Sequence, residues 1–184
     1  MTVRTDVGKT DEMQAMAEEV SRRWKVADVL VNNAGVSCDS LLLKQSEEDW
    51  EKTMTINLKG VFNAIRAFVP LMKHGGHIIN ISSYSGLKGK TGQAAYSASK
   101  AALLGLSRSA AIELAPAGIR VNAILPGYMA TDMGKASAGA LSGAREESLL
   151  KTLSDPEEVS DFVLYLSGTS NITGQIFSLD SRII

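Results

Sequence analysis

The stretch "ADVLVNNAG" (residues 27–35) decides the fold, because an apolar run passes directly into a polar turn that a glycine closes. The same pattern recurs in "GGHIINISS" (75–83) and in "GIRVNAILPG" (118–127). Each run is largely apolar rather than alternating, which is typical of strands buried on both faces. The three segments therefore predict inner strands of a parallel sheet.

Helical patterns lie between and beyond these strands. We expect helices at 9–24, at 46–73, from Gln93 to about Ala115, and at 155–168. Thr10 and Ser46 are the predicted N-caps of the first two, and Pro156 is expected at the first position of the last. The segments "TVRTDV" (2–7) and "GQIFSLD" (174–180) read as outer strands. Residues 129–147 are rich in small residues without a clear period, so we expect a mobile loop or lid there.

Strands that alternate with helices predict an α/β fold. We expect one Rossmann-type domain over residues 1–184, with a doubly wound parallel sheet covered by helices on both faces. In such sheets ligands bind beyond the carboxyl ends of the strands. Three polar strand ends fall there: Asn32-Asn33, Ser82-Ser83 and Pro126-Gly127. They predict a single crevice.

Composition argues against several classes of partner. The 184 residues carry a formal net charge of −1 without a long run of like charges, so neither nucleic acid nor an anionic membrane surface is expected as a partner. Cys38 is the only cysteine, which fits a reducing compartment; we expect a cytoplasmic protein, with mitochondria as the alternative. His74 and His77 have no accompanying carboxylate cluster, and we expect no metal site.

The stretch "QAAYSASKAALLGL" (93–106) places Tyr96 and Lys100 four residues apart, on one face of a helix. A free phenol has a pKa near ~10, and a neighbouring ammonium lowers it toward neutrality. With a serine hydroxyl from Ser83 to hold a carbonyl oxygen, this set suits ketone reduction. Tyr96 delivers the proton, Lys100 keeps the Tyr96 phenol acidic, and a bound cofactor must supply the hydride. For an isolated Y-x-x-x-K the alternative is a core tyrosine beside a lysine that extends to solvent.

Five motifs resemble the short-chain dehydrogenase/reductase family in order and spacing. They are "NNAG" (32–35), "INISS" (79–83), "YSASK" (96–100), "IRVNAILPG" (119–127) and "TDM" (131–133). The resemblance covers nearly the whole chain, and residues 86–133 look most like the 3-oxoacyl-[acyl-carrier-protein] reductases.

The resemblance implies a set of site residues. Asn57, in "INLKG", joins Ser83, Tyr96 and Lys100 as a catalytic residue that positions a water for a proton relay through Lys100. It also implies a nicotinamide dinucleotide, NADP with NAD as the alternative. The implied cofactor contacts are Asp6 and Val7 at the adenine, Asn32, Ala34 and Gly35 at the adenosine ribose, Tyr96 and Lys100 at the nicotinamide ribose, and Pro126, Gly127, Met129 and Thr131 at the carboxamide.

Two departures from the family pattern stand out. The glycine-rich opening turn of the family, T-G-x-x-x-G-x-G, has no counterpart, since Gly8 is the only glycine before Gly35. We therefore hypothesise a fragment or truncated isoform of a longer reductase, without its first strands and without tight dinucleotide binding. The segment 2–7 then loses its partners or pairs with 27–33, which otherwise becomes an exposed edge. At the other end, Asp180 is followed by "SRII" instead of two glycines.

Three functions compete. The first is an NADP-dependent reductase of 3-oxoacyl thioesters or similar small carbonyl compounds. The second is an NAD-dependent dehydrogenase of small alcohols or steroids. The third is a fold without activity that serves as an oligomer subunit or regulator. The resemblance implies a homodimer or homotetramer formed through the helices at 46–73 and 93–115, whose apolar faces would otherwise only cover the sheet.

Overall fold

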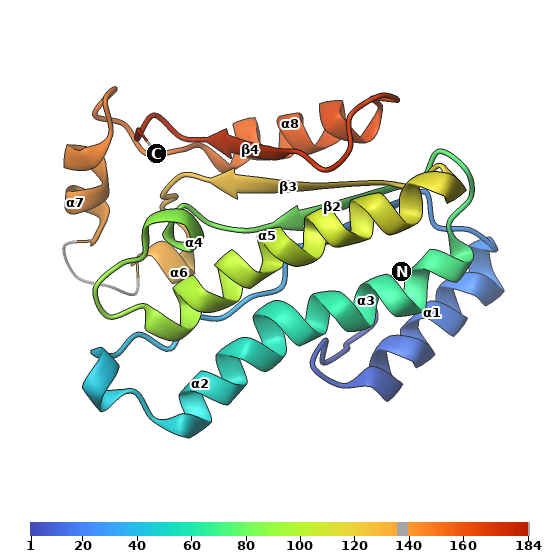
Figure 1. The fold of residues 1–184 in the computed structure, drawn as a ribbon, viewed down its shortest axis with the longest axis horizontal. Helices are drawn as coiled ribbons and strands as arrows, with labels where there is room; N and C mark the ends of the chain where they lie inside the picture. Colours follow the sequence, from blue (N-terminus) through green and yellow to red (C-terminus); the bar gives the residue numbers. More distant parts are fainter. Residues whose placement is uncertain (136–139, 184) are drawn as a thin grey trace.

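The computed structural model describes residues 1–135 and 140–183, and it confirms the α/β class (Figure 1). The strands are β1 (Val29–Asn32), β2 (His77–Ile81), β3 (Arg120–Pro126) and β4 (Ile176–Leu179). All adjacent pairs are parallel, in the order β1-β2-β3-β4. Because the order follows the sequence, each crossover advances the sheet by one strand, and the three carboxyl ends of β1, β2 and β3 meet at one edge.

Helices cover both faces of this sheet (Figure 1). One face carries α1 (Thr10–Trp24), α2 (Glu47–Met54), α3 (Gly60–Phe68) and α5 (Ala94–Leu114), and the other carries α8 (Pro156–Ser167). Neighbouring residues of β2 show the division: Ile78 packs in one core cluster with Ala110 and Ala111 of α5, and Ile79 packs in another with Leu166 of α8. Both isoleucines are fully buried, as expected for an inner strand.

The predicted caps are confirmed at two helices and wrong at one. The Ser46 hydroxyl accepts a hydrogen bond from the Asp49 N–H at 3.1 Å, and Asp155 caps α8 with Pro156 in first position. At α1 the N-cap is Lys9, without a side-chain cap bond. Thr10 is already the first residue of the helix, and its hydroxyl donates to Asn63 Oδ1, 3.2 Å away on α3.

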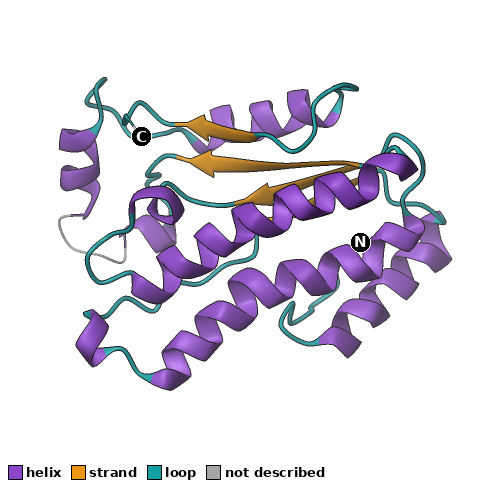
Figure 2. Ribbon diagram, in the orientation of Figure 1, coloured by secondary structure: helices purple, strands orange, loops and turns teal. Residues whose placement is uncertain are grey.

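The helix predicted at 46–73 runs as one rod (Figure 2), and its winding changes in the middle. A π-helical turn, Thr55–Lys59, separates α2 from α3, and a 3₁₀ turn, Val69–Leu71, ends the rod. A π turn inserts one residue into the helical ladder and is frequently found at functional sites. Here the turn contains Asn57.

The strand predicted at 2–7 does not form. Side chains take the backbone groups that a sheet would use: Glu12 accepts from the Asp6 N–H at 2.7 Å, and Asn63 donates to the Val7 carbonyl at 3.0 Å. In the described chain β1 therefore pairs only with β2. Val29 and Val31 are each 42% exposed, so the edge position expected for this strand is confirmed.

The loop predicted at 129–147 is wrong in part. It contains α6 (Asp132–Lys135) and α7 (Ala140–Glu147), and residues 136–139 lie outside the described part of the chain. Ala, Leu, Arg and Glu favour helix even where no apolar period is visible. The remaining short elements are α4 (Ser85–Lys88) and 3₁₀ turns at Leu42–Lys44 and Ala115–Ala117. None of the helices in the described ranges has the length and apolarity that a bilayer crossing needs.

Candidate active site

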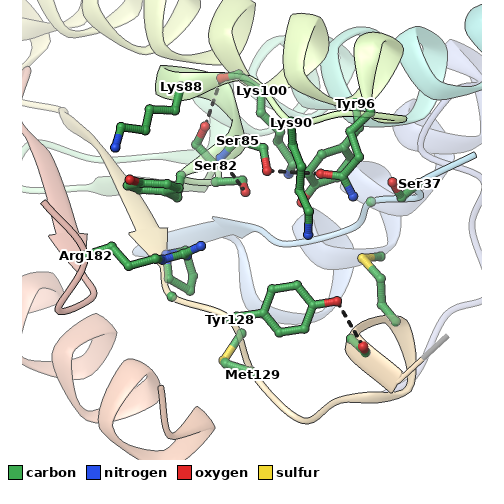
Figure 3. A pocket seen from close by; sticks show the side chains of 18 of the residues that line it. Ser37, Ser82, Ser85, Lys88, Lys90, Tyr96, Lys100, Tyr128, Met129 and Arg182 are labelled. Atoms are coloured by element: carbon green, nitrogen blue, oxygen red, sulfur yellow. Dashed lines mark hydrogen bonds between the residues drawn. The ribbon is translucent and has the colours of Figure 1, made fainter. Parts of the chain in front are cut away.

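A cleft of about 1280 Å³ opens at the carboxyl edge of the sheet. Gly35 lines it from the turn after β1, Ser83 from the end of β2, and Gly127 from the end of β3. The crevice expected from the three polar strand ends is therefore present. Tyr96 and Lys100, from the first turns of α5, line the same cleft (Figure 3).

Ser83 is held with its own proton available. Its Oγ accepts a hydrogen bond from the Ser85 backbone N–H at 3.2 Å, at the first turn of α4. A serine hydroxyl that already accepts one bond can still donate its proton. Ser83 therefore presents a donor to any carbonyl oxygen that enters the cleft.

Lys100 lies beneath the cleft surface, only 4% exposed. Its ammonium nitrogen donates to the Ile81 carbonyl at 2.7 Å and lies 5.7 Å from the centre of the Tyr96 ring. The last carbonyl of β2 thus fixes the ammonium at the strand end, while α5 places the phenol beside it.

Burial sets the electrostatics of this pair. It raises the pKa of Tyr96, because the phenolate is disfavoured away from water; the Ser83 hydroxyl opposes this rise, and the Asp39 charge adds to it. Burial also lowers the pKa of Lys100 to about 8. The expected pKa of Tyr96 below its ordinary value is therefore not met in this structure, where burial is the largest influence and raises that pKa.

Asn57 is fully buried in the π turn and does not line the cleft. Its amide accepts from the Val36 N–H at 2.8 Å and donates to the Val36 carbonyl at 2.9 Å and to Ser99 Oγ at 3.1 Å. It thereby fastens the turn after β1 to α5, one residue before Lys100. A Cβ on Gly35 would lie 3.4 Å from Asn57 Oδ1 and 3.6 Å from Lys100 Nζ, so both side chains border this one glycine.

Comparison with known proteins agrees with this geometry. A family model described as enoyl-(acyl carrier protein) reductase matches residues 1–181. The chain belongs to the short-chain dehydrogenase/reductase family. Like other members, it is an NAD(P)-dependent oxidoreductase.

Curated relatives and a solved structure extend the match. The 3-oxoacyl-[acyl-carrier-protein] reductase FabG of Thermotoga maritima is 39% identical over 187 residues, which cover 97% of this chain and 75% of the relative. The protein of the same name from Staphylococcus aureus is 40% identical, with 94% and 72% covered. A dehydrogenase/reductase from Sinorhizobium meliloti superposes with a TM-score of 0.93 at 31% identity, covering 98% of this chain and 73% of that one.

The structure brings only some of the expected cofactor residues to the cleft. Those that line it are Gly35, Tyr96, Lys100, Pro126, Gly127, Met129 and Thr131. These groups fit a nicotinamide dinucleotide: Tyr96 and Lys100 supply donors for ribose hydroxyls, and the side-chain-free turn at Gly35 leaves room beside them.

Four expected cofactor residues lie elsewhere. Asn32 is buried and donates to Asn80 Oδ1 at 2.8 Å, so it joins β1 to β2. Ala34 does not line the cleft, although its neighbour Asn33 does. Asp6 and Val7 are also outside it: the Asp6 carboxylate accepts from the Gly8 N–H at 2.9 Å, and Val7 packs against α1 and α3.

Sequence reasoning missed a second group of cleft residues. They are Asp39, Tyr84, Ser85, Lys88, Lys90, Gln93, Tyr128 and Arg182. Arg182 belongs to the unusual "SRII" ending, where its guanidinium lies 4.1 Å from the centre of the Tyr84 ring and Tyr84 donates to the Ile183 carbonyl at 2.9 Å. No local motif indicates these positions, since they meet only when four segments fold together. Among the described residues, no group of three His, Cys, Asp or Glu side chains is placed to hold a metal.

Proposed function

We propose that this chain is a reductase of 3-oxoacyl thioesters that uses NADPH, with NADH as the alternative. The observation that carries the proposal is the convergence of Ser83, Tyr96 and Lys100 in one cleft at the carboxyl edge of the sheet. The names of the curated relatives support the substrate class, because 3-oxoacyl-[acyl-carrier-protein] reductases match over most of the chain.

Each side chain has a separate role in the proposed reaction. The nicotinamide cofactor, when bound, supplies the hydride. The Ser83 hydroxyl donates a hydrogen bond to the ketone oxygen, and Tyr96 gives that oxygen its proton. A raised pKa suits this role, since Tyr96 then holds its proton at neutral pH. The Lys100 ammonium stabilises the phenolate that is left, and Asn57 positions the Gly35 turn against α5.

Lys88 and Lys90 favour a thioester with a phosphate-bearing carrier over a neutral alcohol. Both are exposed and line the cleft, and neither has an ion-pair partner among the described residues. The Lys90 ammonium lies 5.0 Å from the centre of the Tyr128 ring, on the far side of the cleft (Figure 3). Two cations without carboxylate partners fit the phosphates of coenzyme A or of a phosphopantetheine arm.

The test is reduction of a 3-oxoacyl thioester by the purified chain, followed by the loss of NADPH absorbance. Tyr96→Phe removes the proton and retains the ring, so turnover falls by about 10²–10⁴-fold. NADPH affinity, measured by fluorescence titration, stays near the wild-type value. Tyr165→Phe, on the exposed face of α8, is the matched control. Retention of most turnover in Tyr96→Phe contradicts the assigned acid.

The same NADPH titration distinguishes the proposed reductase from a non-catalytic protein. A wild type that binds no NADPH and reduces no carbonyl supports a non-catalytic member that acts within an oligomer. Micromolar NADPH affinity together with turnover rules out that alternative.

Self-association through α3 and α5 is the second part of the proposal. A groove of about 530 Å³ is lined by Met54, Leu58, Phe62 and Leu106, and Phe62 is 44% exposed. A second copy related by a two-fold axis would cover this apolar face with the same face of its own. Sedimentation tests it: Phe62→Lys shifts the chain to monomer, whereas Ile112→Lys, outside the groove on α5, leaves the oligomer intact.

A further inference from the structure

Ser83 stands at the end of a series of hydrogen bonds. Its Oγ accepts from the Ser85 N–H; the Ser85 hydroxyl donates to Gln93 Oε1 at 3.1 Å, a bond drawn in Figure 3; and Gln93 Nε2 donates to Asp39 Oδ2 at 3.0 Å. Asp39 also accepts from the Ser37 hydroxyl. The series therefore runs from the end of β2, through the turn before α5, to the segment after β1.

A backbone bridge accompanies the series. The Ser40 N–H donates to the Gly92 carbonyl at 2.8 Å, so residues 39–40 and 92–93 are joined by one backbone and one side-chain bond. Asp39 is the outer member, exposed at the cleft, and Ser85 and Gln93 are part-buried. The segment after β1 thus supports the turn that leads into α5.

The energetics argue against a role in holding the fold. Exposed and part-exposed hydrogen bonds contribute little net stability, because water replaces them when they break. Asp39, Gln93 and Ser85 all line the cleft, and their hydrogen bonds restrict the position of Ser83. Positional precision at a reacting oxygen matters even where stability does not, since small displacements reduce rate strongly.

We propose that Asp39, Gln93 and Ser85 are positioning residues that fix the Ser83 hydroxyl for the ketone. The inference rests on the proposed function, because it assigns these residues to the same carbonyl reduction. They act through Ser83. The Ser85 N–H occupies one lone pair of Ser83 Oγ. Gln93 in turn holds Ser85 in place, because its amide oxygen accepts from the Ser85 hydroxyl.

Asp39 has a second effect that can be measured separately. The charged and titratable groups that face the Tyr96 phenol are Asp39, Tyr128 and Lys100, beside the Ser83 hydroxyl. Among these, the Asp39 carboxylate repels the phenolate. A neutral residue at position 39 therefore makes Tyr96 more acidic, whereas changes at Ser85 or Gln93 retain that carboxylate.

The test uses Ser85→Ala, Gln93→Ala, Asp39→Asn and the double variant Ser85→Ala/Gln93→Ala. Ser85→Ala and Gln93→Ala each lose about three- to ten-fold in kcat, the equivalent of one net hydrogen bond, with KM nearly unchanged. Asp39→Asn retains an oxygen that can accept from Gln93 Nε2, so it tests the effect of the Asp39 charge on Tyr96 and not the loss of a hydrogen bond. The double variant loses no more than the larger single loss, because both substitutions interrupt one series. Asp28→Asn, which precedes β1 at the opposite end of the sheet, is the matched control and retains wild-type kcat.

Two results overturn the inference: wild-type kcat in both Ser85→Ala and Gln93→Ala, or a double variant whose losses multiply. A readout independent of turnover is ¹³Cζ-tyrosine NMR, assigned with Tyr96→Phe. The pKa of Tyr96 falls in Asp39→Asn and stays constant in Asp28→Asn.

Failure of the proposed function looks different. If the wild type reduces no carbonyl, a crystal structure of Gln93→Ala still decides the positioning role. Displacement of Ser83 Oγ from its wild-type place supports the role, and an unchanged Ser83 Oγ overturns it.

Discussion

Lys100 places its ammonium nitrogen 5.7 Å from the centre of the Tyr96 ring while its hydrogen bond goes to the Ile81 carbonyl. In this arrangement burial disfavours both charged forms, the ammonium and the phenolate. A proton that leaves Tyr96 creates a negative charge beside the buried positive one, and each then stabilises the other. Before proton transfer the Lys100 ammonium is therefore buried without a counter-charge from Tyr96, and after proton transfer the phenolate and the ammonium stabilise each other.

Lys100→Met is expected to stabilise the fold while abolishing turnover. Lowering of the Lys100 pKa from 10.5 to about 8 means that the buried charge costs about 3 kcal/mol at neutral pH. Methionine removes that cost but leaves the Ile81 carbonyl without its donor, a loss of about 1 kcal/mol. We expect a net gain of about 1–2 kcal/mol in the free energy of unfolding, measured by urea titration. Exposed Lys44→Met is the control, and a loss of stability in Lys100→Met contradicts the prediction.

Reduction is expected to slow at alkaline pH. Lys100 is protonated below about pH 8 in the folded chain and loses its charge as the pH rises through that value. Tyr96 contributes no transition there, since burial raises its pKa above the ordinary value of 10.0. The pH profile of kcat/KM, which reports the free enzyme, should descend above about pH 8. A profile that stays flat to about pH 10 contradicts this assignment.

Lys88 and Lys90 are expected to distinguish charged from neutral substrates. In Lys88→Gln/Lys90→Gln, KM for a 3-oxoacyl-coenzyme A rises by about three- to ten-fold, the amount expected of exposed ion contacts. KM for a neutral 3-oxo ester remains constant, because that substrate carries no phosphate for the two lysines to bind. The preference of the wild type for the 3-oxoacyl-coenzyme A over the neutral ester should also weaken at high salt. The control is Lys44→Gln/Lys73→Gln, which changes two exposed lysines outside the cleft. An equal rise in KM for the neutral ester in Lys88→Gln/Lys90→Gln contradicts the assignment of these lysines to phosphate binding.

The fold could be predicted from sequence where local patterns settle the outcome. β1, β2, β3, α5 and α8 form where the sequence patterns indicate, because an apolar run of strand length and a helix-forming run of residues each favour one kind of element. The segment 2–7 has strand composition, but strand formation depends on a partner. Side chains of Glu12 and Asn63 bind its backbone instead, and neither is visible in the segment itself.

The site shows the same division. Ser83, Tyr96 and Lys100 could be placed together because a strand end and one helix face fix them. The sign of the Tyr96 pKa shift could not, since it depends on how much water the folded cleft excludes. Asp39 and Gln93 are separated by 54 residues, and their hydrogen bond exists only after two loops meet. Such long-range polar contacts carry no periodic signal.

His77 is expected to make the fold acid-sensitive well above the pKa of most carboxylates. It opens β2, is fully buried, and its Nε2 accepts from Asn122 Nδ2 at 2.8 Å, while its Nδ1 has no hydrogen-bond partner in the described chain. Burial and the nearby Arg120 charge lower its pKa to about 4 from 6.5. The folded chain therefore binds fewer protons than the unfolded chain, and stability falls as the pH drops from about 6.5 toward about 4.

The loss is about 2 kcal/mol between about pH 7 and about pH 5, measured by urea unfolding at each pH. His77→Gln retains an acceptor for Asn122 without a titratable ring, so its stability should change far less over this interval. His74→Gln, three residues earlier and exposed, is the matched control and should retain the wild-type slope. If His74→Gln flattens the slope and His77→Gln does not, the acid sensitivity belongs to the exposed ring and the assignment to His77 fails.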